Sequence, residues 1–225
     1  MAKFAIPGAI VLVGLMIAGA VFFSSNAPAN TNQEAADASI ALPVTEDDHI
    51  QGSPDAKIVI IEYSDIDCPF CKEYHKTMKQ IIAEYGPSGD VAWVYRHFPL
   101  TSIHPNAAKH AVAAECVAEI GGNDSFWSFL DILFENAPGN QQTDPSRYAE
   151  FAGTLGVSAE DLNACIEKGD ALKHVEGEFN TAIAAGGTGT PFNIVIVEGQ
   201  EPVGFSRALP YDQMKGIIDQ ILSSQ

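Results

Sequence analysis

The chain has 225 residues, of which 46% are hydrophobic and 18% are charged, values typical of a globular protein with a sizeable core. Its formal net charge of −17 argues against binding to nucleic acid and against adhesion to an anionic lipid surface. The four cysteines are an even number, which favours an oxidising compartment in a chain that carries an export signal.

The N-terminal segment predicts such a signal. Phe4–Phe23 is an uncharged apolar stretch of about 20 residues, long enough to cross the hydrocarbon core of a bilayer. Ala27-Pro28-Ala29 resembles a cleavage site, so residues 1–23 are either an uncleaved transmembrane anchor or a signal segment. With Lys3 on the cytoplasmic side, both alternatives export the rest of the chain. Residues 24–45 are polar and aperiodic and predict a disordered linker, so we expect an extracytoplasmic protein tethered to the cytoplasmic membrane.

The folded part begins with a strand, a helix and a second strand. Lys57–Ser64 is a nearly continuous β-branched run, the pattern of a buried central strand. Apolar residues recur at helical spacing from Phe70 to Tyr85, and a loop then leads to a second apolar strand, Val91–Phe98. A strand–helix–strand unit of this length implies a parallel pair joined by a right-handed crossover.

The second half is mostly helical and returns to strands near its end. Gly-, Pro- and Asn-containing breaks between residues 104 and 185 separate four helical stretches: Pro105–Ile120, Ser125–Asn136, Arg147–Leu155 and Ala159–Lys168. Two short strands, Asn193–Glu198 and Pro202–Phe205, precede a closing amphipathic helix, Leu209–Leu222. We therefore expect one α/β domain over residues 46–225 with a helical insertion at about 104–185.

A Cys-x-x-Cys motif, Cys68-Pro69-Phe70-Cys71, lies at the first strand–helix junction. Proline favours the first helical position, which puts Cys68 at the N-cap, facing unpaired backbone N–H groups and the positive end of the helix dipole. Both lower a thiol pKa from about 8.5 into the reactive range of roughly 3.5 to 7.5. Cys68 is therefore the expected nucleophile and Cys71 the resolving thiol. Two structural thiols, or a zinc site completed by His75, are the alternatives.

These residues, together with the late Gly189-Thr190-Pro191-Phe192, resemble the DsbA-like thiol–disulfide oxidoreductases of the thioredoxin superfamily. The resemblance runs from about Asp48 to the C-terminus and implies a thioredoxin-like fold with inserted helices. It also implies a cis Thr190–Pro191 bond facing the cysteines, where an extended substrate adds as a strand beside Pro69 and Phe70. A trans proline that opens a strand is the alternative.

The same resemblance implies donation of the Cys68–Cys71 disulfide to unfolded, cysteine-containing exported polypeptides. A membrane redox partner would then restore the disulfide, and neither an organic cofactor nor a metal is expected. A reductase or isomerase of the same fold, and a peptide-holding, chaperone-like module without catalysis, are the alternatives.

Three further residues have expected roles. Glu62 lies on an otherwise apolar strand, where burial of a carboxylate is costly. The resemblance implies a buried acid there that shuttles the proton of the inner cysteine, and a solvent-facing position on an edge strand is the alternative. Cys116 and Cys165 lie on separate predicted helices without a Cys-x-x-Cys pattern, so we expect a structural disulfide between them rather than two separate buried thiols.

Acidic residues and histidines complete the candidate set. Asp65 and Asp67 lie just before Cys68, and their negative charge opposes thiolate formation. Four histidines have a spacing that indicates neither a metal site nor a catalytic triad, and we expect ordinary surface or hydrogen-bonded residues: His97, His104, His110 and His174.

Overall fold

The computed structural model describes residues 44–137 and 143–224. The predicted anchor or signal segment, residues 1–23, and nearly all of the predicted linker lie outside this range. Within the described residues, no helix has both the length and the apolar character needed to cross a bilayer.

The centre of the protein is a five-stranded mixed sheet in the order β1-β3-β2-β4-β5. β2 and β3 are parallel, as the predicted crossover requires, whereas β1 pairs antiparallel with β3, and β4 pairs antiparallel with both β2 and β5. The strand bounds are β1 His49–Gln51, β2 Ile58–Ser64, β3 Val91–His97, β4 Phe192–Val197 and β5 Val203–Phe205.

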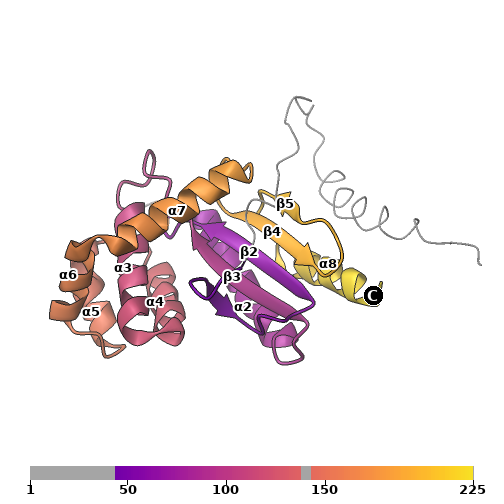
Figure 1. Ribbon diagram of the computed structural model, residues 1–225, viewed down its shortest axis with the longest axis horizontal. Coiled ribbons are helices and arrows are strands. Elements are labelled where there is room, and N and C mark those ends of the chain that lie inside the picture. Colours follow the sequence, from indigo (N-terminus) through magenta and orange to yellow (C-terminus); the bar gives the residue numbers. More distant parts are fainter. Residues whose placement is uncertain (1–43, 138–142, 225) are drawn as a thin grey trace, which may run out of the picture.

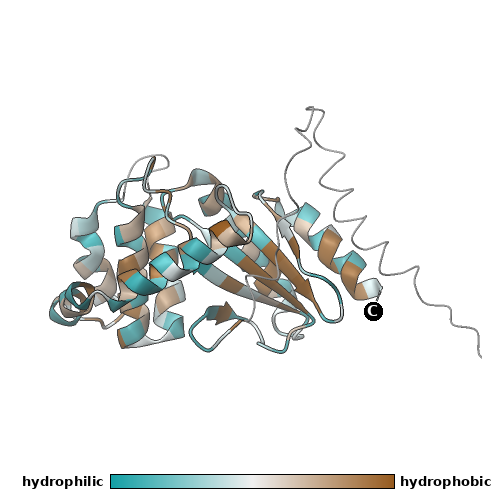
Figure 2. Ribbon diagram, turned by 45° about the horizontal axis from the view of Figure 1, so that its top comes forward, coloured by the Kyte–Doolittle hydropathy of each residue, from teal (hydrophilic) through white to brown (hydrophobic). Residues whose placement is uncertain are grey.

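Both faces of β2 are buried, which explains its nearly continuous apolar sequence. Side chains alternate along the strand, so Ile58 and Ile60 pack into the core on the side of α2 (Pro69–Tyr85) and α8 (Tyr211–Ser223). Ile61 and Tyr63 pack on the opposite side, in a smaller cluster that includes residues of α7 (Asp170–Ala184). Figure 2 shows the strands hydrophobic along much of their length and the helices amphipathic.

The inserted helices form a group beside the sheet, and α7 runs from this group back along it (Figure 1). The helices of the group are α3 Ala107–Gly121, α4 Asn123–Asn136, the 3-10 turn η2 Pro145–Arg147, α5 Tyr148–Gly153 and α6 Ala159–Lys168. A disulfide joins Cys116 on α3 to Cys165 on α6, with an S–S distance of 2.07 Å. The pair expected from sequence is thus bonded in the structure, and the alternative of two separate thiols is wrong.

The predicted α/β fold with a helical insertion is confirmed, and the differences are local. The strand β1 was not predicted, because three residues are too few to establish a periodic pattern. The helix α7 was not separated from the rest of the insertion. Gly169, which joins α6 to α7, has φ of 79°, a left-handed conformation that ends one helix and allows the next to begin.

Candidate active site

The two cysteines of the motif lie at the N-terminus of α2. Cys68 is the N-cap residue in an extended conformation, and Pro69 occupies the first turn, as predicted. Both cysteines are free thiols; Cys68 is 5% exposed and Cys71 is completely buried. Cys68 is therefore the more accessible of the two sulfurs, while Cys71 lies one turn behind it.

The pKa values of the two thiols are shifted in opposite directions. A hydrogen bond from the Cys71 thiol lowers the pKa of Cys68 to about 6, helped by the Thr190 side chain and the backbone N–H groups of Cys71 and Phe70, and opposed by burial. Burial raises the pKa of Cys71 well above its ordinary value, and the neighbouring Cys68 and Glu62 raise it further. At neutral pH, Cys68 is thus a thiolate and Cys71 a protonated thiol.

The segment 190–191 faces the nucleophile. The Thr190–Pro191 peptide bond is cis, and the Cys68 thiol donates to the Thr190 carbonyl oxygen across 3.6 Å. Phe70 is 66% exposed and lines a cavity of about 410 Å³ together with Thr190 and Pro191. Three of the four predicted substrate-binding residues therefore share one cavity. Pro69 is half-buried and does not line it.

Glu62 is completely buried on the central strand β2, so the alternative of a solvent-facing edge position is wrong. It lies on the α2 side of the sheet, where its Oε2 accepts a hydrogen bond of 3.0 Å from Nε1 of Trp93. Burial raises the pKa of Glu62 to about 8, although the nearby Ser64 side chain and the hydrogen bond from Trp93 oppose the increase. A buried acid that is mostly protonated at neutral pH therefore lies close enough to Cys71 to influence its charge.

Comparison with known proteins places this geometry in a family. A protein-family model described as thioredoxin matches residues 44–220. The chain belongs to the thioredoxin family.

Solved structures agree with a DsbA-like form of this fold. The alpha-DsbA1 structure of Wolbachia pipientis superimposes with a TM-score of 0.71 at 20% identity, covering 83% of this chain and 96% of that one. BdbD of Bacillus subtilis gives 0.69 at 23% identity, and DsbA2 of Pseudomonas aeruginosa gives 0.64 at 25%; each match covers 80% of this chain and 96% of the other. The likeness expected from the Cys-Pro-Phe-Cys and Thr-Pro segments is confirmed.

Curated relatives match over shorter stretches of much longer proteins. The Na(+)/H(+) antiporter NhaA 3 of Salinispora tropica is 36% identical over 112 residues, which are 49% of this chain and 16% of that protein. An NhaA 1 antiporter of Mycolicibacterium vanbaalenii is 33% identical over 150 residues, 66% of this chain and 23% of that protein. The thioredoxin-family chain thus spans less than a quarter of these relatives, and their transport activity is not transferred to it.

Asp65 and Asp67, whose negative charge was expected to oppose ionisation of Cys68, are buried and accept hydrogen bonds. Asp65 accepts hydrogen bonds from the backbone N–H of Leu100 at 2.7 Å and from Nδ1 of His104 at 2.9 Å. Asp67 lies 3.1 Å from Nε2 of His110, which is completely buried. His110 is therefore one of the hydrogen-bonded histidines expected from sequence, and its partner is the carboxylate next to Cys68. The effect of Asp67 on the pKa of Cys68 stays a prediction.

His75, the histidine of the zinc alternative, is paired with another residue. His75 is buried and bound through Nε2 to Asp131 at 2.7 Å. Among residues 44–137 and 143–224, the group of potential metal ligands that lie within ligand distance of one another is His97, Glu115 and Glu178, and it contains neither cysteine.

Proposed function

We propose that the protein is a thiol–disulfide oxidoreductase that donates its Cys68–Cys71 disulfide to thiols of exported polypeptides. One observation carries the proposal: the folded chain lowers the pKa of Cys68 to about 6 while it raises that of Cys71. A stabilised thiolate favours the reduced form of the pair, so the disulfide form is a good electron acceptor. This asymmetry favours donation over the reductase or isomerase direction.

The reaction proceeds by two exchanges. A client thiolate attacks Cys68 of the disulfide, the bond to Cys71 breaks, and a mixed disulfide forms between the client and Cys68. A second client thiolate then attacks the client sulfur of this bond, which forms the client disulfide and releases Cys68 as a thiolate. The client loses two electrons, and the cysteine pair gains them. The low pKa of Cys68 speeds the second step, since a weaker base leaves faster.

Glu62 supplies the proton that the first step requires. Cys71 leaves as a thiolate in a buried environment that disfavours its charge. Glu62, with a pKa of about 8, holds a proton at neutral pH and passes it to Cys71. Its Oε1 has no hydrogen-bond partner among the described residues, which leaves that oxygen to carry the proton.

The client backbone binds in the cavity beside Cys68. The exposed ring of Phe70 forms one wall, and Thr190 and Pro191 form another. Backbone groups of Thr190 pair with an extended client segment as an added strand, which suits an unfolded polypeptide because main-chain pairing is independent of client sequence. A chaperone-like module would use the same groove without exchange.

We place this activity outside the cytoplasm, with a membrane redox partner that restores the disulfide. The apolar N-terminal segment supports export. The second disulfide, Cys116–Cys165, supports an oxidising compartment, because such bonds are rare where thiols are kept reduced.

A redox titration of the Cys68–Cys71 pair against glutathione, combined with two activity assays, tests the proposal. We expect a potential above about −180 mV and faster refolding of a reduced, cysteine-containing client. The Cys68→Ser variant is the control and should be inactive. A potential near −270 mV with rapid insulin reduction would assign a reductase instead. Client binding without either reaction would assign a holding module.

A further inference from the structure

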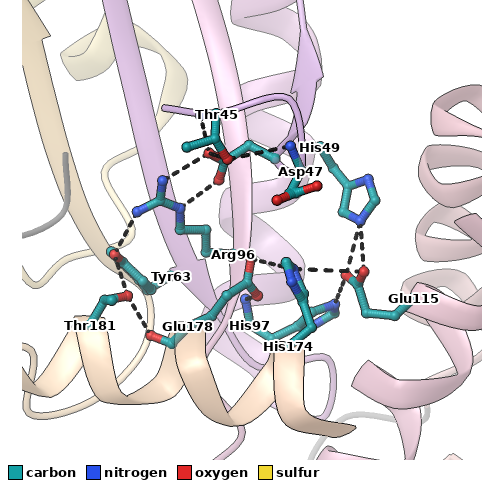
Figure 3. Close-up of polar contacts among 11 residues, drawn as sticks. Thr45, Asp47, His49, Tyr63, Arg96, His97, Glu115, His174, Glu178 and Thr181 are labelled. Atoms are coloured by element: carbon teal, nitrogen blue, oxygen red, sulfur yellow. Dashed lines mark hydrogen bonds and ion pairs between the residues drawn. The ribbon is translucent and has the colours of Figure 1, made fainter. Parts of the chain in front are cut away.

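A second cluster of reactive side chains lies where the sheet meets the inserted helices. We call it the His/Glu cluster: His49 on β1, His97 at the end of β3, Glu115 on α3, and His174 and Glu178 on α7. Figure 3 shows the three imidazoles converging on the Glu115 carboxylate from separate elements. The cluster lies outside the residues that the disulfide exchange uses.

The donor atoms are spaced as metal ligands are. Nε2 of His97 lies 3.0 Å from Oε1 of Glu115, and Nε2 of His174 lies 3.2 Å from Oε1 of Glu178 and 3.8 Å from Oε2 of Glu115. Ligand atoms of His97, Glu115 and Glu178 all lie within 4.8 Å of one another. A tetrahedral zinc ion with bonds of about 2.0–2.1 Å separates its ligands by about 3.4 Å, so His97, Glu115 and Glu178 would need only to draw together, and His174, which lies outside that group of three, would have to move toward them.

Burial and hydrogen bonding indicate that the His/Glu cluster is preorganised. His97 is 1% exposed and Glu178 is 8% exposed, and the backbone N–H of His97 donates to Oε2 of Glu178 at 2.6 Å. Nε2 of His174 is a buried atom that, despite its nearby carboxylates, makes no hydrogen bond of acceptable geometry with the described residues. His174 instead forms ion pairs with Glu178 and Glu115 through this nitrogen, so the same atom faces both carboxylates that a metal ion would bind.

The chemistry of the donors favours zinc over calcium or magnesium. Imidazole nitrogen together with carboxylate oxygen is a common zinc ligand set, whereas the hard cations prefer oxygen alone. The adjacent Glu178 carboxylate raises the pKa of His174 to about 9, so zinc would have to replace the proton of that imidazolium; with neutral imidazoles the two glutamates leave a charge of −2, which one divalent cation would neutralise. Nε2 of His49 contacts both Glu115 oxygens, at 2.9 and 3.1 Å, and so can orient that carboxylate from outside the metal.

An acidic cavity gives the cluster access to solvent. The cavity, of about 600 Å³, is lined by His49, Glu115 and His174 and by further acidic side chains: Glu46, Asp47, Asp48, Glu119 and Asp170. Asp48 pairs with Arg96, and Glu119 and Asp170 pair with Lys168, so part of this negative charge is balanced. The remaining field would concentrate cations at the entrance.

We propose that His97, His174, Glu115 and Glu178 bind one zinc ion, with His49 holding Glu115 in position. The ion would join the end of β3 to α3 and α7, and so fix the helical insertion against the sheet. The site is independent of the proposed redox function, because it uses neither cysteine of the motif. It also departs from the expectation, drawn from the resemblance, that the protein needs no metal.

The test uses the full chain with Cys68→Ser/Cys71→Ser, so that no thiolate competes for metal. After removal of metal by a chelator, zinc chloride is titrated by calorimetry, and cobalt(II) is added in a parallel sample. We expect one zinc per chain, a higher melting temperature with zinc, and visible cobalt absorption typical of a tetrahedral site. In His174→Gln, at a half-exposed position, zinc affinity should fall by about tenfold or more and the thermal shift should shrink.

Two more variants keep the outcome clear. Glu115→Gln should weaken zinc as well, while His75→Gln, which removes a histidine from a carboxylate pair elsewhere, should bind zinc like the parent. Circular dichroism verifies that each variant folds. Equal zinc affinity in the parent and in His174→Gln and Glu115→Gln would overturn the proposal. So would calcium binding as tight as zinc, because an oxygen-preferring ion would not use the imidazoles.

Discussion

The hydroxyl of Thr190 should control how much of Cys68 is ionised at neutral pH. This oxygen is buried and has no hydrogen-bond partner in the described part of the chain, yet the Thr190 side chain lowers the pKa of Cys68. The thiol of Cys68 donates to the Thr190 carbonyl, so the hydroxyl is left for the thiolate. Replacement by valine keeps the shape of the side chain and removes only this donor.

The size of the effect follows from the strength of a hydrogen bond to a charged group, about 1.5 to 3 kcal/mol. At 1.36 kcal/mol per pKa unit, Thr190→Val should raise the pKa of Cys68 by about one to two units, from about 6 to about 7 or 8. At pH 7 the thiolate fraction would fall from about 90% to between about 10% and 50%. The reduced form would lose about 1 kcal/mol, which makes the potential more negative by about 20 to 30 mV.

The lowered pKa of Cys68 also determines how the redox potential changes with pH. The folded chain lowers the pKa of Cys68 from 9.0, so the stabilisation of the reduced form is complete above pH 9 and is lost as the pH falls through about 6. The potentials of the wild type and Thr190→Val should therefore coincide below about pH 6 and separate above it.

Thiolate absorbance of the reduced full chain, measured against pH, provides the assay. Cys71 ionises well above this range, so the first absorbance step belongs to Cys68. Thr188→Val is the matched control, since Thr188 is exposed and lines the same cavity. If Thr190→Val titrates with the pKa of the wild type, the hydroxyl does not bind the thiolate and the reasoning is wrong.

Four further outcomes are expected. Cys71→Ala should accumulate mixed disulfides with clients on a non-reducing gel, because Cys68 can still bond to a client sulfur and no Cys71 thiol is left to displace the client; Cys68→Ala should accumulate almost none, and equal trapping would contradict the assigned roles. Glu62→Gln should slow the exchange by about 100-fold and remove the step near pH 8 from its pH profile. The same variant should raise the free energy of unfolding at pH 7 by about 3 kcal/mol, because the wild-type acid ionises freely only when unfolded; urea denaturation that shows no gain would refute this. Reduction of the Cys116–Cys165 bond, which spans 49 residues, should destabilise the fold by up to about 4 kcal/mol in calorimetry, with the reactivity of Cys68 unchanged as the internal control.

Most of the fold was predictable from local pattern. The β-branched run that became β2 and the helical spacing after Pro69 each carry enough residues to define a period, and their predicted limits differ from the observed ones by one residue at most. The antiparallel pairing of β4 with β2 has no such signal, because strand direction depends on where the helical insertion returns the chain. The three-residue strand β1 owes its position to its pairing with β3, a contact between segments far apart in sequence.

The active site was predictable where it depends on the helix terminus. The position of Cys68 follows from the conformational preference of Pro69, and the burial of Glu62 follows from its apolar neighbours on a central strand. The magnitude of the Glu62 pKa shift could not be predicted, because burial competes with the hydrogen bond from Trp93, which arrives from the neighbouring strand.

The histidines show most clearly what local pattern leaves out. His104 and His110 bind Asp65 and Asp67 from 39 and 43 residues away, and the backbone of Thr143 reaches Asp67 from 76 residues away. No periodicity relates such positions, because the insertion must fold before they meet. These contacts hold the two carboxylates directly before Cys68, and all three come from residues that follow β3, outside the strand–helix–strand unit that carries the cysteines. The insertion is therefore part of the active site: it fixes the loop from which the nucleophile enters α2.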